Sequence, residues 1–196
     1  MASSSAECSA PRAPPPPDQL AAFYKLVDKQ TTASVLCRHA RSADLSSQAA
    51  LEAEALFGDD SLVISDLQMS ENTALTNLAR EAGGAEKEAL HRRAWAVLAS
   101  AINLLLRRLE ADTVLPGTLR EEELDYEAHS KASVFKAKNE PVPPPFLLRS
   151  WASMLGYVTL LNAMVTSLHL LRYSYWPTVQ KRVVESCVLR GLDVIP

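Results

Sequence analysis

The sequence contains little of what builds a β-sandwich or a disulfide-linked fold. Only 6 of its 196 residues are glycine, too few for the many tight turns between short strands. The three cysteines, Cys8, Cys37 and Cys187, are far apart, odd in number and form no Cys-x-x-Cys pair. This pattern is typical of free thiols in a reducing compartment, and the first residues lack the basic and apolar regions of a secretory signal. We therefore predict a cytoplasmic protein.

An excess of charge of one sign is also lacking. The formal net charge is -3, and the basic residues are dispersed, with Arg92-Arg93 and Arg107-Arg108 as isolated pairs. No basic face interleaved with aromatic residues indicates a nucleic-acid interface. Because the chain is close to neutral, bulk attraction to nucleic acid or to anionic lipid is not expected.

The motifs of common catalytic and metal sites are missing. No Walker loop, Rossmann glycine pattern, His-Glu-x-x-His or Gly-x-Ser-x-Gly occurs. Cys37 and His39 supply only two ligands of a tetrahedral site, and Glu88 with His91 forms only half of a di-iron Glu-x-x-His pair. We predict no catalytic residue, no cofactor and no metal site. Four histidines occur, none of them paired at His-x-x-x-His spacing: His39, His91, His129 and His169.

Two further groups of residues are candidates for contact with a partner. Acidic side chains gather at Glu121–Glu123, Asp125 and Glu127, where they could bind a cation or a basic partner. Because they complement the dipole at the start of a helix, we interpret them as a solvated helix start. The tryptophans could anchor an interface, although packing in the core is the commoner role and our interpretation. They are Trp95, Trp151 and Trp176.

Composition divides the chain into a tail and one domain. Residues 1–17 are rich in Ala, Ser and Pro and cannot bury enough apolar area to offset the entropy of ordering, so we expect a disordered tail. Residues 18–196 are predicted to form a single all-α domain, because Ala and Leu dominate its apolar set and apolar residues recur at helical spacing. The chain finishes on Leu192-Asp193-Val194-Ile195-Pro196 without a polar closing segment, so we expect that this domain is truncated at the C-terminus.

Capping and breaking residues divide this domain into about eight helices. Gly58 and Gly83-Gly84 are expected to end the third and fourth of them. The first four are expected to begin near residues that can cap a helix: Asp18, Thr31 or Thr32, Ser46 or Ser47, and Asp59-Asp60-Ser61.

The fifth and sixth predicted helices are marked by charge. The fifth covers roughly Ala85 to Ala111 and is uncharged between Arg93 and Arg107, which predicts packing on more than one side. Thr118 is expected to cap the sixth, which begins acidic, finishes basic and ends before the prolines of residues 141–145.

The seventh predicted helix, residues 146–173, contains the longest uncharged run. Its length would suffice to cross a bilayer, but it includes several polar residues, and Arg149 and Arg172 balance its flanks. We interpret it as the central buried helix of a bundle, with a membrane-associated helix as the alternative. Pro177 is expected to open the eighth helix.

Two stretches resemble tetratricopeptide repeats of the kinesin-light-chain type. Residues 50–63 look like the end of a second helix followed by a Gly-Asp turn, and 76–79 with 90–94 look like the Asn-Leu-Ala and Leu-Tyr-Arg-Arg-Ala segments of a helix pair. The resemblance covers residues 45–110, with a shorter loop at Gly83-Gly84 than in that family. It implies a right-handed helical array that binds peptides or partner proteins on a concave face, and it carries over no functional residue.

The sequence therefore predicts antiparallel helix pairs, stacked as a short tetratricopeptide-like array or as an irregular helical bundle. The function that this architecture favours is a non-catalytic protein–protein interaction module with a protein or peptide partner. Two alternatives remain open: an all-α enzyme or cofactor binder with an untypical site, and a membrane-associated protein using residues 146–173. An open groove lined by polar residues, with scattered histidines, would favour the first function.

Overall fold

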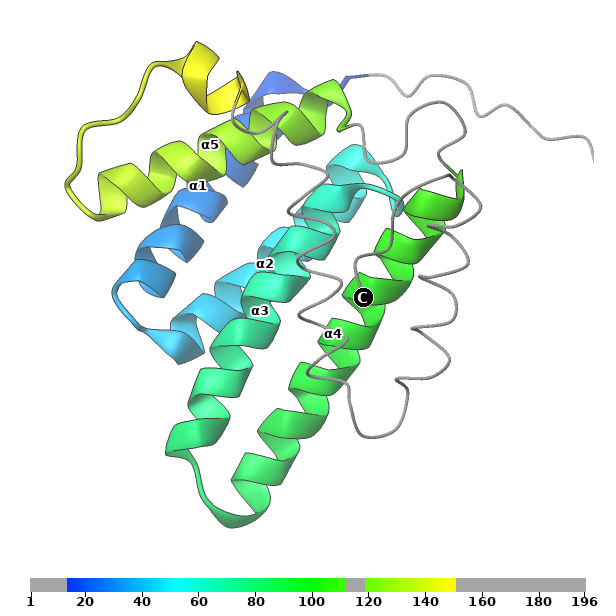
Figure 1. Cartoon of the computed structure of the whole chain (residues 1–196), viewed down its shortest axis with the longest axis vertical. Coiled ribbons are helices and arrows are strands. Elements are labelled where there is room, and N and C mark those ends of the chain that lie inside the picture. The colour runs from blue at the N-terminus through cyan, green and yellow to red at the C-terminus, as the bar shows by residue number, and fades with distance from the viewer. Residues whose placement is uncertain (1–13, 112–118, 151–196) are drawn as a thin grey trace, which may run out of the picture.

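The computed structural model describes residues 14–111 and 119–150, and this part of the chain is all-helical, with six helices and no strand (Figure 1). The predicted fold class is therefore confirmed. A short helical segment occupies residues 145–150, where the description stops, so the rest of the seventh predicted helix and all of the eighth lie outside it. The longer helices are α1 (Pro17–Val35), α2 (His39–Phe57), α3 (Leu62–Glu81), α4 (Gly84–Ala111) and α5 (Glu121–Ala137).

The helices pack as a bundle. Short turns join α1 to α2, α2 to α3 and α3 to α4, and each of these consecutive pairs is in contact, so that α3 lies between α2 and α4. The fifth helix does not continue this series, because α5 packs against α1 and also touches α3 (Figure 1). Helices far apart in the sequence thus lie side by side.

Aromatic rings hold α1, α2 and α5 together in the core. The ring of Phe23 meets that of Phe57 edge-on, with centroids 5.4 Å apart, and lies 6.1 Å from that of Tyr126. All three side chains are buried. Since each ring comes from a different helix, this cluster fixes how α5 sits against the first two helices.

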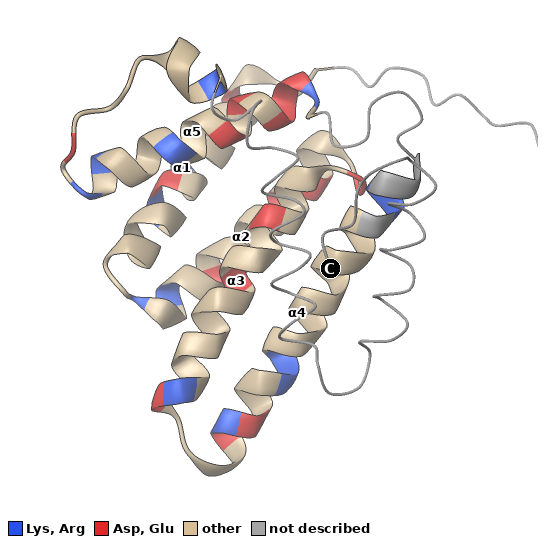
Figure 2. Ribbon diagram, in the orientation of Figure 1, with Lys and Arg blue, Asp and Glu red and all other residues tan. Residues whose placement is uncertain are grey.

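Polar side chains set the register between α3 and α4. Ser65 Oγ donates to the backbone oxygen of Ala101 at 3.3 Å, and Asn72 Nδ2 donates to that of Ala94 at 2.8 Å. Both acceptors belong to alanines, whose small side chains let α3 approach the α4 backbone closely enough for these bonds. Ser100 of α4 is nevertheless exposed, so the uncharged stretch of α4 (Figure 2) is not buried on every side.

The predicted boundaries between the first three helices are wrong. Thr31 and Thr32 lie inside α1, and the hydroxyl of Thr32 donates to the backbone oxygen of Asp28, one turn back, instead of capping a new helix. Ser46 lies inside α2 and is fully buried. The residues assigned to the second and third predicted helices therefore belong to the end of α1 and to α2.

The later boundaries agree better with the sequence. Ser61 is the N-cap of α3, and its Oγ accepts a bond from the backbone N–H of Val63 at 3.3 Å. Gly58 ends α2 with a φ of 97°, which favours glycine. The observed α4 starts at Gly84, one residue before the predicted start. Thr118, the predicted cap of the sixth helix, lies outside the described residues, and Arg120 is the N-cap of α5.

The turn between α1 and α2 places a non-glycine residue in the left-handed region. Cys37 has a φ of 53°, and its N–H donates to Ser34 O while that of Arg38 donates to Ala33 O, at 3.0 and 2.9 Å. These two bonds form a Schellman motif, whose left-handed position is usually occupied by glycine.

Replacing Cys37 by glycine should raise the free energy of unfolding by about 1 kcal/mol, because glycine adopts this conformation without the steric cost that a Cβ imposes. The thiol is exposed and contributes no packing. Urea denaturation followed by circular dichroism measures the effect. Cys37→Ala is the matched control, since it removes the thiol and retains the Cβ, and equal stability of the two variants would contradict the explanation.

Candidate interaction groove

Three consecutive helices line a groove with a volume of about 400 Å³. Because α3 lies between α2 and α4, it forms the floor of the groove and the other two helices form its walls. The lining positions on each helix extend over eight residues, or about 10 Å of helix. They are Ser47, Ala50, Leu51 and Glu54 of α2, Ile64, Gln68 and Glu71 of α3, and Arg93, Ala96, Val97 and Ser100 of α4.

An ion pair closes one end of the groove. Arg93 of α4 donates to Glu71 Oε1 of α3 through Nη2 at 2.7 Å and through Nε at 3.2 Å. The Glu71 side chain is buried and that of Arg93 is about half exposed. Because the guanidinium already binds this buried carboxylate, the two charges largely compensate each other.

Unpaired acceptors lie further along the groove. Gln68 Nε2 donates to Ser100 Oγ at 3.1 Å, whereas Gln68 Oε1 is buried and has no hydrogen-bond partner. On the α2 wall, Glu54 is exposed and forms no ion pair within the described part of the chain. Leu51, on the same wall, is 67% exposed. The groove therefore combines free acceptors with an apolar contact surface, and the described residues that line it include neither histidine nor cysteine.

The acidic start of α5 is not the solvated helix start that the sequence predicts, because Glu123 is buried. Its Oε1 accepts the backbone N–H of Leu62 at 2.9 Å, and its Oε2 accepts that of Arg120 at 2.8 Å. Burial raises the pKa of Glu123, and these two bonds and the nearby Arg108 oppose the rise. A single carboxylate thus caps the first turns of both α3 and α5. Glu121, by contrast, is exposed, as expected.

A second acidic residue joins the same group of charges. Arg120 binds Asp60 with both terminal nitrogens, Nη1 to Oδ1 at 3.0 Å and Nη2 to Oδ2. Its hydrogen bond lowers the pKa of Asp60, and Arg108 lies 3.7 Å from the same carboxylate. The charges connect the turn before α3, the last part of α4 and the start of α5, so they stabilise the fold beside the groove and do not line it.

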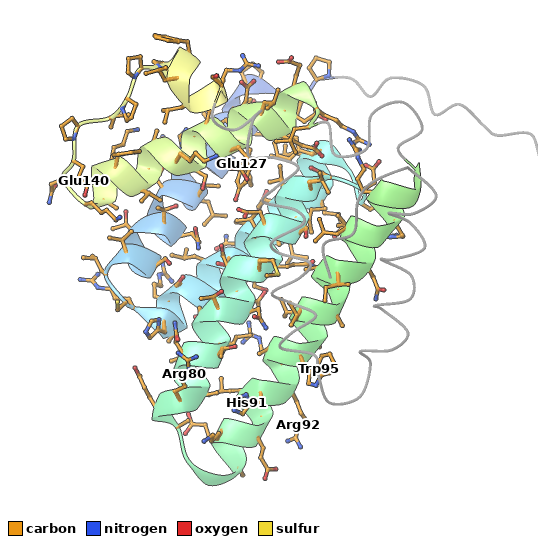
Figure 3. All side chains as sticks on the ribbon, in the orientation of Figure 1. Arg80, His91, Arg92, Trp95, Glu127 and Glu140 are labelled. Carbon is orange, nitrogen blue, oxygen red and sulfur yellow. The ribbon has the colours of Figure 1, made fainter. Side chains whose placement is uncertain are left out.

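A tyrosine–aspartate pair connects α5 to α3. Tyr126 Oη donates to Asp66 Oδ2 at 2.7 Å. Burial raises the pKa of Asp66 to about 6, and the negative charge of Glu127, which lies on α5 (Figure 3), contributes to the rise. Burial also raises the pKa of Tyr126. No motif in the sequence indicates this pair.

A serine, a histidine and an aspartate meet between α1 and α5, but not as a nucleophilic triad. His129 Nε2 lies 2.9 Å from Asp28 Oδ1, and Ser133 Oγ donates to that same oxygen. In a catalytic triad the serine must contact the histidine ring, which removes its proton. The ring of Tyr24 stacks on His129 with centroids 4.3 Å apart, so these residues join the two helices.

The other residues considered from the sequence are scattered. Cys37 lies exposed in the turn between α1 and α2, His39 begins α2, and His91 lies on α4 near the α3–α4 turn (Figure 3). Among the described residues, no group of three or more His, Cys, Asp or Glu side chains is arranged to hold a metal ion. Trp95 is partly buried on α4. His169, Trp151 and Trp176 lie outside the described residues.

None of the helices in residues 14–111 and 119–150 is long and apolar enough to cross a membrane. The membrane alternative rests on residues 146–173, of which only the first five are described.

No protein-family model, no curated protein and no solved structure matches this chain. The groove and the contacts around it are therefore the observations from which a function can be inferred.

Proposed function

We propose that the protein is a non-catalytic interaction module that binds a segment of a partner protein in the groove formed by α2, α3 and α4. The observation that carries the proposal is the groove itself, which is lined by charged, polar and apolar side chains over two helical turns. Its lining includes no nucleophile paired with a base, and its volume suits a few side chains of a bound peptide.

The packing of α2, α3 and α4 supports the proposal, because a groove along successive helices is how tetratricopeptide arrays bind peptides. The likeness to such an array concerns these three helices. The contact of α5 with α1 does not occur in such an array, because each unit of an array contacts only its neighbours. We propose an array-like binding face within a closed bundle, in a protein of the cytoplasm.

Filling the groove should weaken partner binding strongly. Ala96 is a small, exposed lining residue, and Ala96→Trp is expected to weaken binding at least about tenfold, because the indole would occupy the space of the partner segment. Affinity capture from cell extract, followed by titration of the recovered partner, measures the loss.

The matched control is Ala22→Trp, which places the same side chain on an exposed position of α1 that does not line the groove. Its affinity should equal that of the wild type. A partner that binds both variants as tightly as the wild type would contradict the proposal.

A further inference from the structure

We infer that the groove recognises a basic side chain, lysine or arginine, of the partner segment, an inference that rests on the proposed function. It combines the unpaired acceptor on the floor, the surplus carboxylate on the α2 wall, and the apolar surface beside them. Each of these is considered in turn.

The acceptor is Gln68 Oε1. It is buried and unbonded, although the amide nitrogen of the same side chain is held by Ser100 Oγ at 3.1 Å. A buried carbonyl oxygen without a donor is unfavourable, so a ligand that donates a hydrogen bond here gains affinity. The floor of the groove thus selects a donor.

The surplus charge is that of Glu54. Three of the described residues that line the groove are charged, and two of them, Glu71 and Arg93, bind each other. Glu54 has no partner in the described part of the chain, which gives the lining a net negative charge. A cationic donor satisfies both Glu54 and Gln68, whereas an acidic group would meet two carboxylates and an arginine that is already bound.

The shape of a lysine or arginine side chain fits the same surface. Each has an aliphatic stem that packs on apolar groups and a head that keeps its donors available. Leu51 and Ala50 of the α2 wall offer apolar contact for the stem. The head then carries the donors and the positive charge that the lining lacks.

The test uses three peptide libraries, randomised around a fixed central lysine, glutamate or glutamine, selected on the full-length chain. The lysine library should be enriched over the other two, and Glu54→Gln should weaken the selected peptides about tenfold. Glu54→Lys should reverse the preference towards the glutamate library. Glu52→Lys is the matched control, because it places the same charge change on an exposed position of α2 outside the lining, and it should keep the lysine preference.

A second variant separates the acceptor from the charge. Gln68→Met retains the length of the side chain and removes Oε1, and it leaves the charge of Glu54 in place. Lysine peptides should therefore bind this variant more weakly than the wild type. Glutamate or glutamine peptides that bind the wild type and are blocked by Ala96→Trp would overturn the basic specificity and leave the proposed function standing. Selection of peptides that Ala96→Trp does not affect, or selection of none, would overturn the proposed function and the specificity with it.

Discussion

Replacing Glu123 by alanine should lower the free energy of unfolding by about 3 to 5 kcal/mol, the cost of breaking a buried charge pair by removing one partner. The carboxylate accepts the backbone N–H groups of Leu62 and Arg120, and Arg108 Nη2 lies 3.7 Å from Oε2. Its loss therefore leaves the N–H groups of Leu62 and Arg120 without these acceptors and takes a counter-charge from a buried guanidinium. Urea denaturation followed by circular dichroism measures the change.

Glu122→Ala is the matched control for this prediction. Glu122 is the neighbouring residue and carries the same charge in the same turn, but it is only partly buried and accepts neither of these bonds. Its replacement should change stability by about 0.5 kcal/mol or less. If Glu123→Ala cost no more than Glu122→Ala, the capping role of Glu123 would be wrong.

Mild acid should stabilise the fold through Asp66. Its pKa is about 6 in the folded chain against 3.8 as the ordinary value, so the folded state takes up a proton that the unfolded state does not. The stabilisation from this proton is complete when the pH lies below 3.8, the pKa of Asp66 in the unfolded chain. It is lost as the pH rises through about 6, the pKa in the folded chain. The whole difference amounts to about 3 kcal/mol, of which about 1.4 kcal/mol falls between about pH 7 and about pH 5.

Comparison with Asp66→Asn isolates this effect from the other groups. Burial of Glu123 acts in the same direction, whereas the lowered pKa of Asp60 acts in the opposite one, and both remain in the variant. The asparagine oxygen can still accept the bond from Tyr126 Oη. The stability of the wild type relative to the variant should therefore rise on acidification, as measured by urea denaturation at several pH values. Parallel pH profiles would contradict the assignment.

The sequence predicts helices well where local chemistry decides. The long helix expected over roughly Ala85 to Ala111 is observed as α4, Gly84–Ala111, because acidic residues at its start, arginines at its end and the two glycines at its N-terminal boundary all act locally. Ser61 and Gly58 are local signals in the same way. The helix starts predicted at Thr31 and Ser46 are wrong because a hydroxyl residue fits the interior of a helix as well as its cap. Packing with other helices decides which of these two positions the residue occupies.

The candidate groove is not visible in the sequence because its lining has no common residue type. Ala96 and Ser100 look like ordinary helix positions, and only the packing of three helices places them on one surface. Glu123 shows the same limit, since the N–H of Leu62 that it accepts belongs to a residue 61 positions away. Its place three residues after the N-cap of α5, where a glutamate often bonds back to the cap, was the available signal.

The central claim is that a partner segment lies in the groove of α2, α3 and α4. Hydrogen exchange, measured by mass spectrometry on the full-length chain with and without the captured partner, tests it most directly. The account predicts slower exchange in residues 47–54, 64–71 and 93–100 when the partner is bound. Protection confined to α1 and α5, with those three segments unchanged, would contradict it.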